Sequence, residues 1–247
     1  MLAPPFTPFE QISSSLQERG YAVLSPDCFA KEVDLNLSDL NALKPFWERL
    51  PRDPYLKDGG RYRFRRHASY TVQDSELVLA PHRAHWQSVD YNALHGGIER
   101  RFEPLEASLL NNPSWQKMIV RMTQVFSKLN PTPKWFVEVH PFRIDTSDGI
   151  GRPTPEGAHR DGVDYVAVIL VDRVGVKGGE TRIFEAQGSI GLRFTLQDSW
   201  SALILNDAKM IHETTPIQPI ATAGYRDTLV LTFRRNGFQE PPKQIDQ

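Results

Sequence analysis

Shortly after its midpoint, the chain reads His159-Arg-Asp-Gly-Val-Asp-Tyr-Val-Ala-Val-Ile-Leu-Val171. The part from Gly162 onward is rich in β-branched and aromatic residues, which predicts a strand over residues 162–171. In a strand, residues i and i+2 project to the same face. At the start of this strand, the side chains of His159 and Asp161 could therefore converge on one point.

A second histidine follows at a distance. His212 comes 53 residues after His159, within Met210-Ile-His-Glu-Thr-Thr-Pro216. The apolar run Ser201–Leu205 and the turn-like segment 206–209 precede it, so this region predicts a strand, a turn and a second strand.

Arg226 lies 14 residues beyond His212 and opens a further predicted strand, 226–233. The period of two in a strand places its residues on two different faces. One face is polar enough to line a ligand cavity and carries Arg226, Thr228, Val230 and Thr232. The other is apolar enough to pack under helices and carries Leu229, Leu231 and Phe233.

The order His-x-Asp, His, Arg indicates a metal site. Two imidazoles and one carboxylate can occupy one face of a coordination sphere and leave positions open, which suits Fe(II) that binds a co-substrate and dioxygen. Arg226 could then bind the far carboxylate of the co-substrate. Two alternatives remain open: a zinc enzyme with the same ligands, in which Arg226 has no obvious role, and a non-catalytic metal-binding or stress protein.

Four stretches carry a resemblance to a known family. They are Pro155-Glu-Gly-Ala-His-Arg-Asp-Gly162, Gly178-Gly-Glu180, Asn206-Asp207 with His212, and Gly224-Tyr-Arg-Asp227. Together they resemble the Fe(II)/2-oxoglutarate dioxygenases that hydroxylate free aliphatic L-amino acids, such as the bacterial isoleucine and leucine hydroxylases. The similarity extends upstream through residues 85–92 and 96–100. Some relatives are known only as stress- or biofilm-associated proteins.

This resemblance implies a mainly β fold with flanking helices, the double-stranded β-helix or jelly roll. It implies that His159, Asp161 and His212 hold Fe(II), and that O2 and 2-oxoglutarate are co-substrates. The C5 carboxylate of 2-oxoglutarate would then meet Arg226, and Thr228 could add a hydroxyl donor.

The implied substrate is a small molecule, a free aliphatic L-amino acid, with a nucleic acid or a peptide as the alternative. Candidate contacts for it are His140, Arg143, Glu156 and Tyr165. Other residues near the triad could supply charge or an apolar wall: Arg160, Asp164 and Phe184.

We expect a single domain over residues 1–247, with helical support and outer strands in 1–130 and the jelly-roll core in 131–238. Apolar spacing predicts helices over 9–19, 35–50 and 113–129, and a strand over 21–24. A chain of this length can bury a sizeable core without staples.

Composition excludes several classes of protein. Lys plus Arg number 29 against 30 Asp plus Glu, so no global field favours nucleic acid or an anionic membrane. No run is long enough to cross a bilayer, and no signal peptide is visible. The single cysteine, Cys28, fits a reducing compartment. We therefore expect a cytoplasmic protein, which could form a homo-oligomer.

One segment, Arg61-Tyr-Arg-Phe-Arg-Arg-His67, alternates basic and aromatic residues. It could line a nucleic-acid groove, but an ordinary strand with one solvated face is the preferred interpretation. The histidines without a partner at ligand spacing are expected to be hydrogen-bonded or at the surface: His67, His82, His85 and His95.

Overall fold

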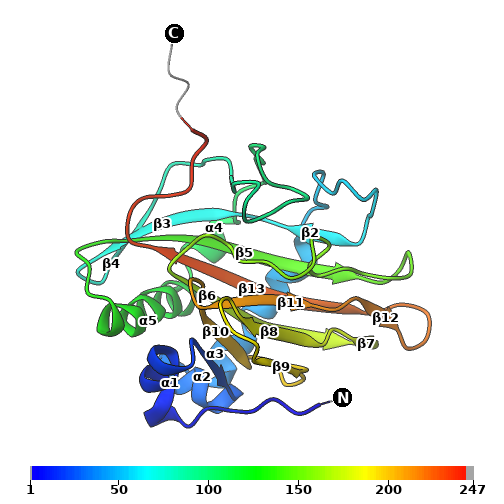
Figure 1. Cartoon of the computed structure of the whole chain (residues 1–247). Helices are drawn as coiled ribbons and strands as arrows, with labels where there is room; N and C mark the ends of the chain where they lie inside the picture. Colours follow the sequence, from blue (N-terminus) through cyan, green and yellow to red (C-terminus); the bar gives the residue numbers. More distant parts are fainter. Residues whose placement is uncertain (1, 243–247) are drawn as a thin grey trace.

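The computed structural model describes residues 2–242. Its largest feature is an antiparallel sheet, whose strands run across the picture in Figure 1. The strands follow the order β1 (Tyr21–Leu24), β10 (Ala202–Asn206), β6 (Tyr165–Val174), β13 (Tyr225–Arg234), β5 (Trp135–Asp145), β3 (Ala68–Gln73) and β4 (Glu76–Leu79). The short β2 (Arg63–Arg65) also pairs with β5.

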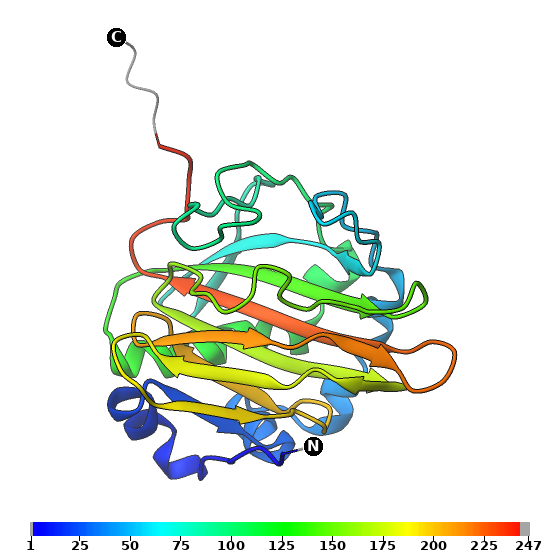
Figure 2. The same cartoon turned by 45° about the vertical axis from the view of Figure 1, so that its right-hand side comes forward.

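Two smaller antiparallel sheets form a second layer (Figure 2). One has the order β11 (Met210–Thr214), β8 (Thr181–Glu185) and β9 (Gly191–Phe194), and the other pairs β12 (Ile217–Pro219) with β7 (Val176–Gly178). A cluster of buried apolar side chains from both layers, including Val166, Ile183 and Met210, joins them. Two antiparallel layers packed face to face are the architecture of the jelly roll, so the predicted fold is confirmed.

Helices cover the outer face of the large sheet. They are α1 (Ile12–Glu18), α2 (Pro26–Glu32), α3 (Leu37–Asn41), α4 (Ala107–Leu110) and α5 (Pro113–Leu129), with 3-10 turns η1 (Phe9–Gln11) and η2 (Lys44–Arg49). The predicted bounds of α5 are confirmed. The helix begins at Pro113 because the Asn112 side chain caps its N-terminus and proline suits the first turn. Within residues 2–242, no helix has the length and apolar character required of a membrane span.

The alternation predicted for the last strand is confirmed in β13. Leu229, Leu231 and Phe233 belong to the core beneath the helices. Arg226, Thr228, Val230 and Thr232 line a cavity between the two layers. The neighbouring β5 alternates in the same way, and it contributes Glu138, His140, Phe142 and Ile144 to the cavity. The inner face of the large sheet is therefore polar at its centre.

Two predicted elements differ from the structure. The strand expected from residue 162 begins at Tyr165, because the Asp207 carboxylate accepts the backbone N–H groups of residues 161, 162 and 163 and holds them in a loop. The helix expected over 35–50 is split into α3 and η2. Pro45 has no N–H to donate, so a continuous helix cannot pass through it.

Candidate functional site

The structure brings His159, Asp161 and His212 together at the cavity between the layers. His212 lies on β11, whereas His159 and Asp161 lie on the loop that precedes β6. The Nε2 atom of His159 is 3.8 Å from one Asp161 oxygen, and the Nε2 atom of His212 is 3.7 Å from the other. One ligand atom from each residue falls within 4.8 Å of the others, as a shared metal ion requires.

Neighbouring groups fix the orientation of these side chains. The carbonyl oxygen of Gly157 lies 2.9 Å from His159 Nδ1. A proton on Nδ1 can be donated to that carbonyl, which leaves Nε2 free to bind a metal. The Gln87 side-chain amide donates to Asp161 Oδ1 over 3.0 Å. Burial, and then the charge of His159, hold the pKa of His212 well below its usual value, so this imidazole is in the neutral, metal-binding form. The three residues therefore fit the donor set for Fe(II).

Arg226 is a second part of the cavity that suits a bound ligand. Its side chain is buried, and among residues 2–242 Nε and one terminal nitrogen have no hydrogen-bond partner. Burial, and then the nearby Arg173, lower the pKa of Arg226 to about 10. Thr228 is buried two residues along the same strand face. A buried guanidinium without a counter-ion is strongly unfavourable, so this position suits an anionic ligand.

Close approach of the chain at Gly179 confines Arg226. A Cβ atom at Gly179, where φ is +70°, would lie 2.9 Å from Ile217 and 3.6 Å from Arg226 Cδ. The glycine thus lets the turn after β7 pass over the Arg226 side chain.

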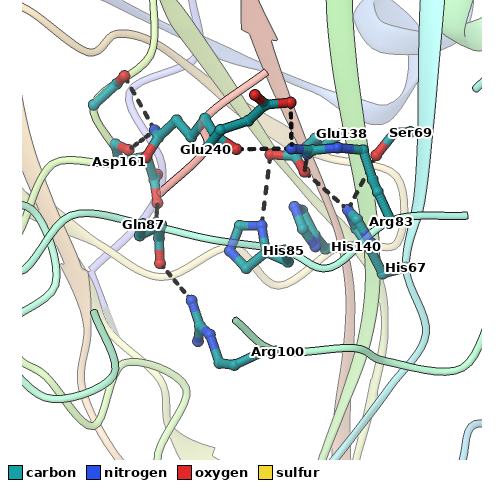
Figure 3. Close-up of polar contacts among 12 residues, drawn as sticks. His67, Ser69, Arg83, His85, Gln87, Arg100, Glu138, His140, Asp161 and Glu240 are labelled. Carbon is teal, nitrogen blue, oxygen red and sulfur yellow. Dashed lines mark hydrogen bonds and ion pairs between the residues drawn. The ribbon is translucent and has the colours of Figure 1, made fainter. Parts of the chain in front are cut away.

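A second cluster of histidines lies along the same cavity (Figure 3). Glu138 lies 3.1 Å from His67 Nε2 and 3.5 Å from His85 Nδ1, and it also accepts a hydrogen bond from Arg83. His140 completes the group. The pKa of each of the three histidines is lowered, mainly by burial, and the pKa of His85 falls to about 3. We expected only hydrogen-bonded or surface roles for His67 and His85, and sequence spacing gave no sign of their convergence.

Geometry argues against a metal ion in this second cluster. The rings of His67 and His140 are stacked, with centroids 4.8 Å apart and planes inclined by 18°. An imidazole nitrogen directs its lone pair within its ring plane, so two stacked rings cannot both point at one ion. The terminal nitrogen of Arg65 also lies 2.6 Å from His140 Nδ1 and occupies that acceptor. The cluster is therefore a hydrogen-bonded network.

The alternating segment 61–67 does not have the solvated face that we expected. Arg63 and Arg65 are both buried and line the cavity. Arg63 pairs with the buried Asp53 at 2.7 Å. The guanidinium of Arg65 lies between two aromatic rings, 3.7 Å from the centroid of Phe102 and 4.3 Å from that of Phe142. A carboxylate and two aromatic rings therefore surround these arginines in place of solvent, and the sequence of residues 61–67 does not indicate these partners.

The structure separates the remaining candidates into two groups. His140 and Glu156 line the cavity. Arg143 instead forms a two-pronged ion pair with Asp227 on the outer face of the large sheet. Tyr165 also faces outward, where its ring stacks on Phe126 in the helix-covered core.

The three secondary candidates also lie outside the cavity lining. Asp164 pairs with Arg235, Arg160 lies over the Tyr91 ring, and Phe184 is exposed on β8. Among the lining residues that were not predicted from the sequence, three come from the irregular segment between β4 and α4: Gln87, Asn92 and Arg100. The one available signal was the resemblance in segments 85–92 and 96–100.

Comparison with known proteins agrees with this geometry. The family described as 2OG-Fe dioxygenase matches residues 44–232. The chain is 25% identical over 232 residues to an L-isoleucine-4-hydroxylase of Bacillus thuringiensis, covering 91% of this chain and 94% of that protein.

Two solved structures share the fold of this chain. A bsmA homolog from Methylobium petroleophilum is 46% identical, with a TM-score of 0.91 and coverage of 97% of this chain and 98% of that one. The structure titled IDO from Bacillus thuringiensis is 20% identical, with a TM-score of 0.71 and coverage of 94% and 100%. Because the family match spans most of the chain and includes the segments that carry both histidines, Asp161 and Arg226, the protein belongs to the 2OG-Fe dioxygenases.

Proposed function

We propose that this dioxygenase hydroxylates a free aliphatic L-amino acid, with Fe(II) held by His159, Asp161 and His212. The family uses Fe(II), 2-oxoglutarate and O2. When bound, these supply the oxidising chemistry that inserts one oxygen atom into a C–H bond, while 2-oxoglutarate is converted to succinate and CO2. The observation that carries the proposal is the presence of the three-residue cluster and the unpartnered Arg226 in one cavity.

The protein's own residues would bind and orient the reactants. Arg226 would pair with the C5 carboxylate of 2-oxoglutarate, and the hydroxyl of Thr228 would lie within reach on the same strand face. Gln87 would keep Asp161 oriented toward the metal.

Two observations support an amino acid as the substrate. One is the similarity to an L-isoleucine-4-hydroxylase, at 25% identity. The other is the lining of the cavity, which combines charged side chains of both signs with an apolar surface from Val163, Val168 and Val230. An aliphatic amino acid needs both kinds of contact.

A nucleic-acid substrate has less support. Of the four arginines in the segment that suggested it, residues 61–67, Arg63 and Arg65 are buried in the cavity, so the segment offers no continuous exposed stripe to a phosphate backbone.

The test is coupled turnover. Purified protein with Fe(II), ascorbate and 2-oxoglutarate should form succinate when a free aliphatic amino acid is added, together with an amino-acid product heavier by one oxygen atom. A panel of isoleucine, leucine, valine and methionine covers the class. If the whole panel is inert while a peptide or nucleic acid is oxidised, the substrate class is wrong and the iron chemistry stands.

A further inference from the structure

Arg100 is a buried cation that the proposed binding of iron and 2-oxoglutarate leaves unused. It is 2% exposed and lines the cavity. One terminal nitrogen donates to Gln87 Oε1 over 2.9 Å, whereas Nε has no partner in the part of the chain that the structure describes. Figure 3 shows the side chain reaching toward Gln87, on the side of that residue away from Asp161. Burial, and then the charge of Arg63, lower the pKa of Arg100 to about 10.

Glu156 is an acidic residue of the same cavity, and it also has unmet hydrogen-bonding capacity. Its side chain is 10% exposed, and one carboxylate oxygen lies 3.7 Å from His159 Nε2. The other oxygen is buried, and no described residue donates a hydrogen bond to it. A buried carboxylate oxygen without a donor is unfavourable, so this position suits a cationic or N–H-bearing group.

Both residues line the same cavity. The charge of Glu156 opposes the lowering of the Arg100 pKa, so each lies in the field of the other. Yet among the residues that the structure describes, no ion pair within 4.0 Å joins them. A ligand that carries both charges could lie between them.

Most other charges near the cavity already have partners. Arg63 pairs with Asp53 through Nε, although one of its terminal nitrogens lacks a partner among the described residues, and Arg83 pairs with Glu138. Arg65 is stacked between two rings and bonded to His140, although its Nε lacks a partner. Arg100, by contrast, donates to a neutral amide oxygen, and among the described residues no carboxylate lies within 4.0 Å of its guanidinium. Glu156 is the acidic residue of the cavity with a buried oxygen that lacks a donor within that part of the chain.

We propose that Arg100 and Glu156 recognise the two charged groups of a free α-amino acid, the carboxylate at Arg100 and the ammonium group at Glu156. This inference rests on the proposed function, because it assumes that the cavity holds the substrate beside the iron. It adds a restriction: both charged groups must be free. Amino-acid amides, N-acylated amino acids and residues within a peptide lose one of the two contacts.

A rival explanation must be separated from this one. Arg100 could act only through Gln87, by keeping Asp161 in position for the metal. In that case, replacement of Arg100 would weaken metal binding and affect every substrate analogue equally.

The experiment is anaerobic titration calorimetry on protein loaded with Fe(II) and 2-oxoglutarate. The probes are L-isoleucine, L-isoleucine amide, which lacks the carboxylate, and 3-methylpentanoic acid, which lacks the amino group. Arg100→Gln and Glu156→Gln each remove one charge. Arg101→Gln and Glu99→Gln are matched controls, because both residues are exposed neighbours in the chain.

A crossed pattern is expected. Arg100→Gln should weaken isoleucine binding about 10- to 150-fold, the range for a hydrogen bond to a charged group, and leave binding of the amide unchanged. Glu156→Gln should weaken isoleucine binding by a similar factor and leave binding of 3-methylpentanoic acid unchanged. The controls should bind all three probes as the wild type does.

Three results would overturn the proposal that Arg100 and Glu156 recognise the amino acid. They are equal weakening of all probes, no weakening of isoleucine binding in either variant, and failure of the wild type to bind isoleucine while it binds the metal and 2-oxoglutarate. Failure to bind the metal or 2-oxoglutarate at all would instead contradict the proposed function. Arg100→Lys and Glu156→Asp keep the charges and should bind isoleucine more tightly than the Gln variants, which separates charge recognition from a folding defect.

Discussion

The main chains of His159 and His212 are hydrogen-bonded to each other in both directions. The N–H of His159 donates to the carbonyl of His212 over 3.0 Å, and the reverse bond is 2.9 Å. This single β-bridge joins positions 53 residues apart, and the ring centroids lie 4.6 Å apart. The spacing of the two imidazoles is therefore set by backbone geometry, which is stiffer than side-chain rotamers.

The first prediction concerns this bridged pair and Asp161. His159→Ala, Asp161→Ala and His212→Ala should each abolish succinate formation and sharply weaken Fe(II) binding, because each removes one of three protein ligands. Metal content after dialysis and coupled turnover are the measurements. His82→Ala, at an exposed histidine, should retain both properties. Full activity in any of the three variants would falsify the metal assignment.

The parts of this site that the sequence could predict lie on regular strands. In β13, the period of two places Arg226 and Thr228 in the cavity and Leu229 in the core, and this follows from the pattern alone. The convergence of His159 and Asp161 was also predictable, because the two residues are separated by two positions. However, a loop held by Asp207 replaces the strand that was expected there.

The rest depends on tertiary contacts. Gln87 and Arg100 lie in an irregular segment, where no period indicates which side chains face inward. The pattern around Arg65 suggested a solvated face, because the rings that enclose its guanidinium, Phe102 and Phe142, come from distant parts of the chain. Tyr165 looked suitable for a substrate wall, but its place in the strand turns it toward the helices.

Arg226→Gln should raise the 2-oxoglutarate requirement about 10- to 150-fold, the effect of losing a hydrogen bond to a charged group. Fe(II) affinity should stay close to that of the wild type, since Arg226 contacts none of the three proposed ligands in the structure. Succinate formation titrated against 2-oxoglutarate measures the first effect, and metal binding measures the second. Arg193→Gln, on the exposed side of β9, is the control. An unchanged titration would mean that Arg226 is structural.

Gln87→Met should release the metal more easily. The Gln87 amide donates to Asp161, and its carbonyl oxygen accepts from Asn92 and Arg100, so the amide is held in one orientation. Loss of such a supporting contact commonly costs about 10- to 100-fold in metal affinity. Competition with a chelator measures this, and Gln187→Met, at an exposed site, is the comparison. Equal metal retention in the two variants would show that Asp161 needs no such support.

Three buried histidines, His67, His85 and His140, should each make a contribution to stability that decreases in acid. Above pH ~6.5, their imidazoles are neutral in both the folded and the unfolded chain. Below it, the unfolded chain takes up protons that the folded chain cannot, since burial lowers the pKa of His67 and His140 and brings that of His85 to about 3. The contribution of each of these three histidines to the free energy of unfolding should therefore decrease as pH falls, by up to about 1.4 kcal/mol per pH unit.

Chemical unfolding of metal-free protein between about pH 7.5 and 5 tests this. The window stays above the ordinary pKa of the buried Glu138, whose own pKa is held well below its usual value by the nearby histidines despite the opposing effect of burial. His85→Asn should reduce the slope of the free energy of unfolding against pH by about the contribution of one histidine, because asparagine takes up no proton in the unfolded chain. His82→Asn should change it little, since His82 is exposed. If His85→Asn and the wild type follow the same pH dependence, then His85 is protonated in the folded protein, and the network around Glu138 carries a charge that its burial argues against.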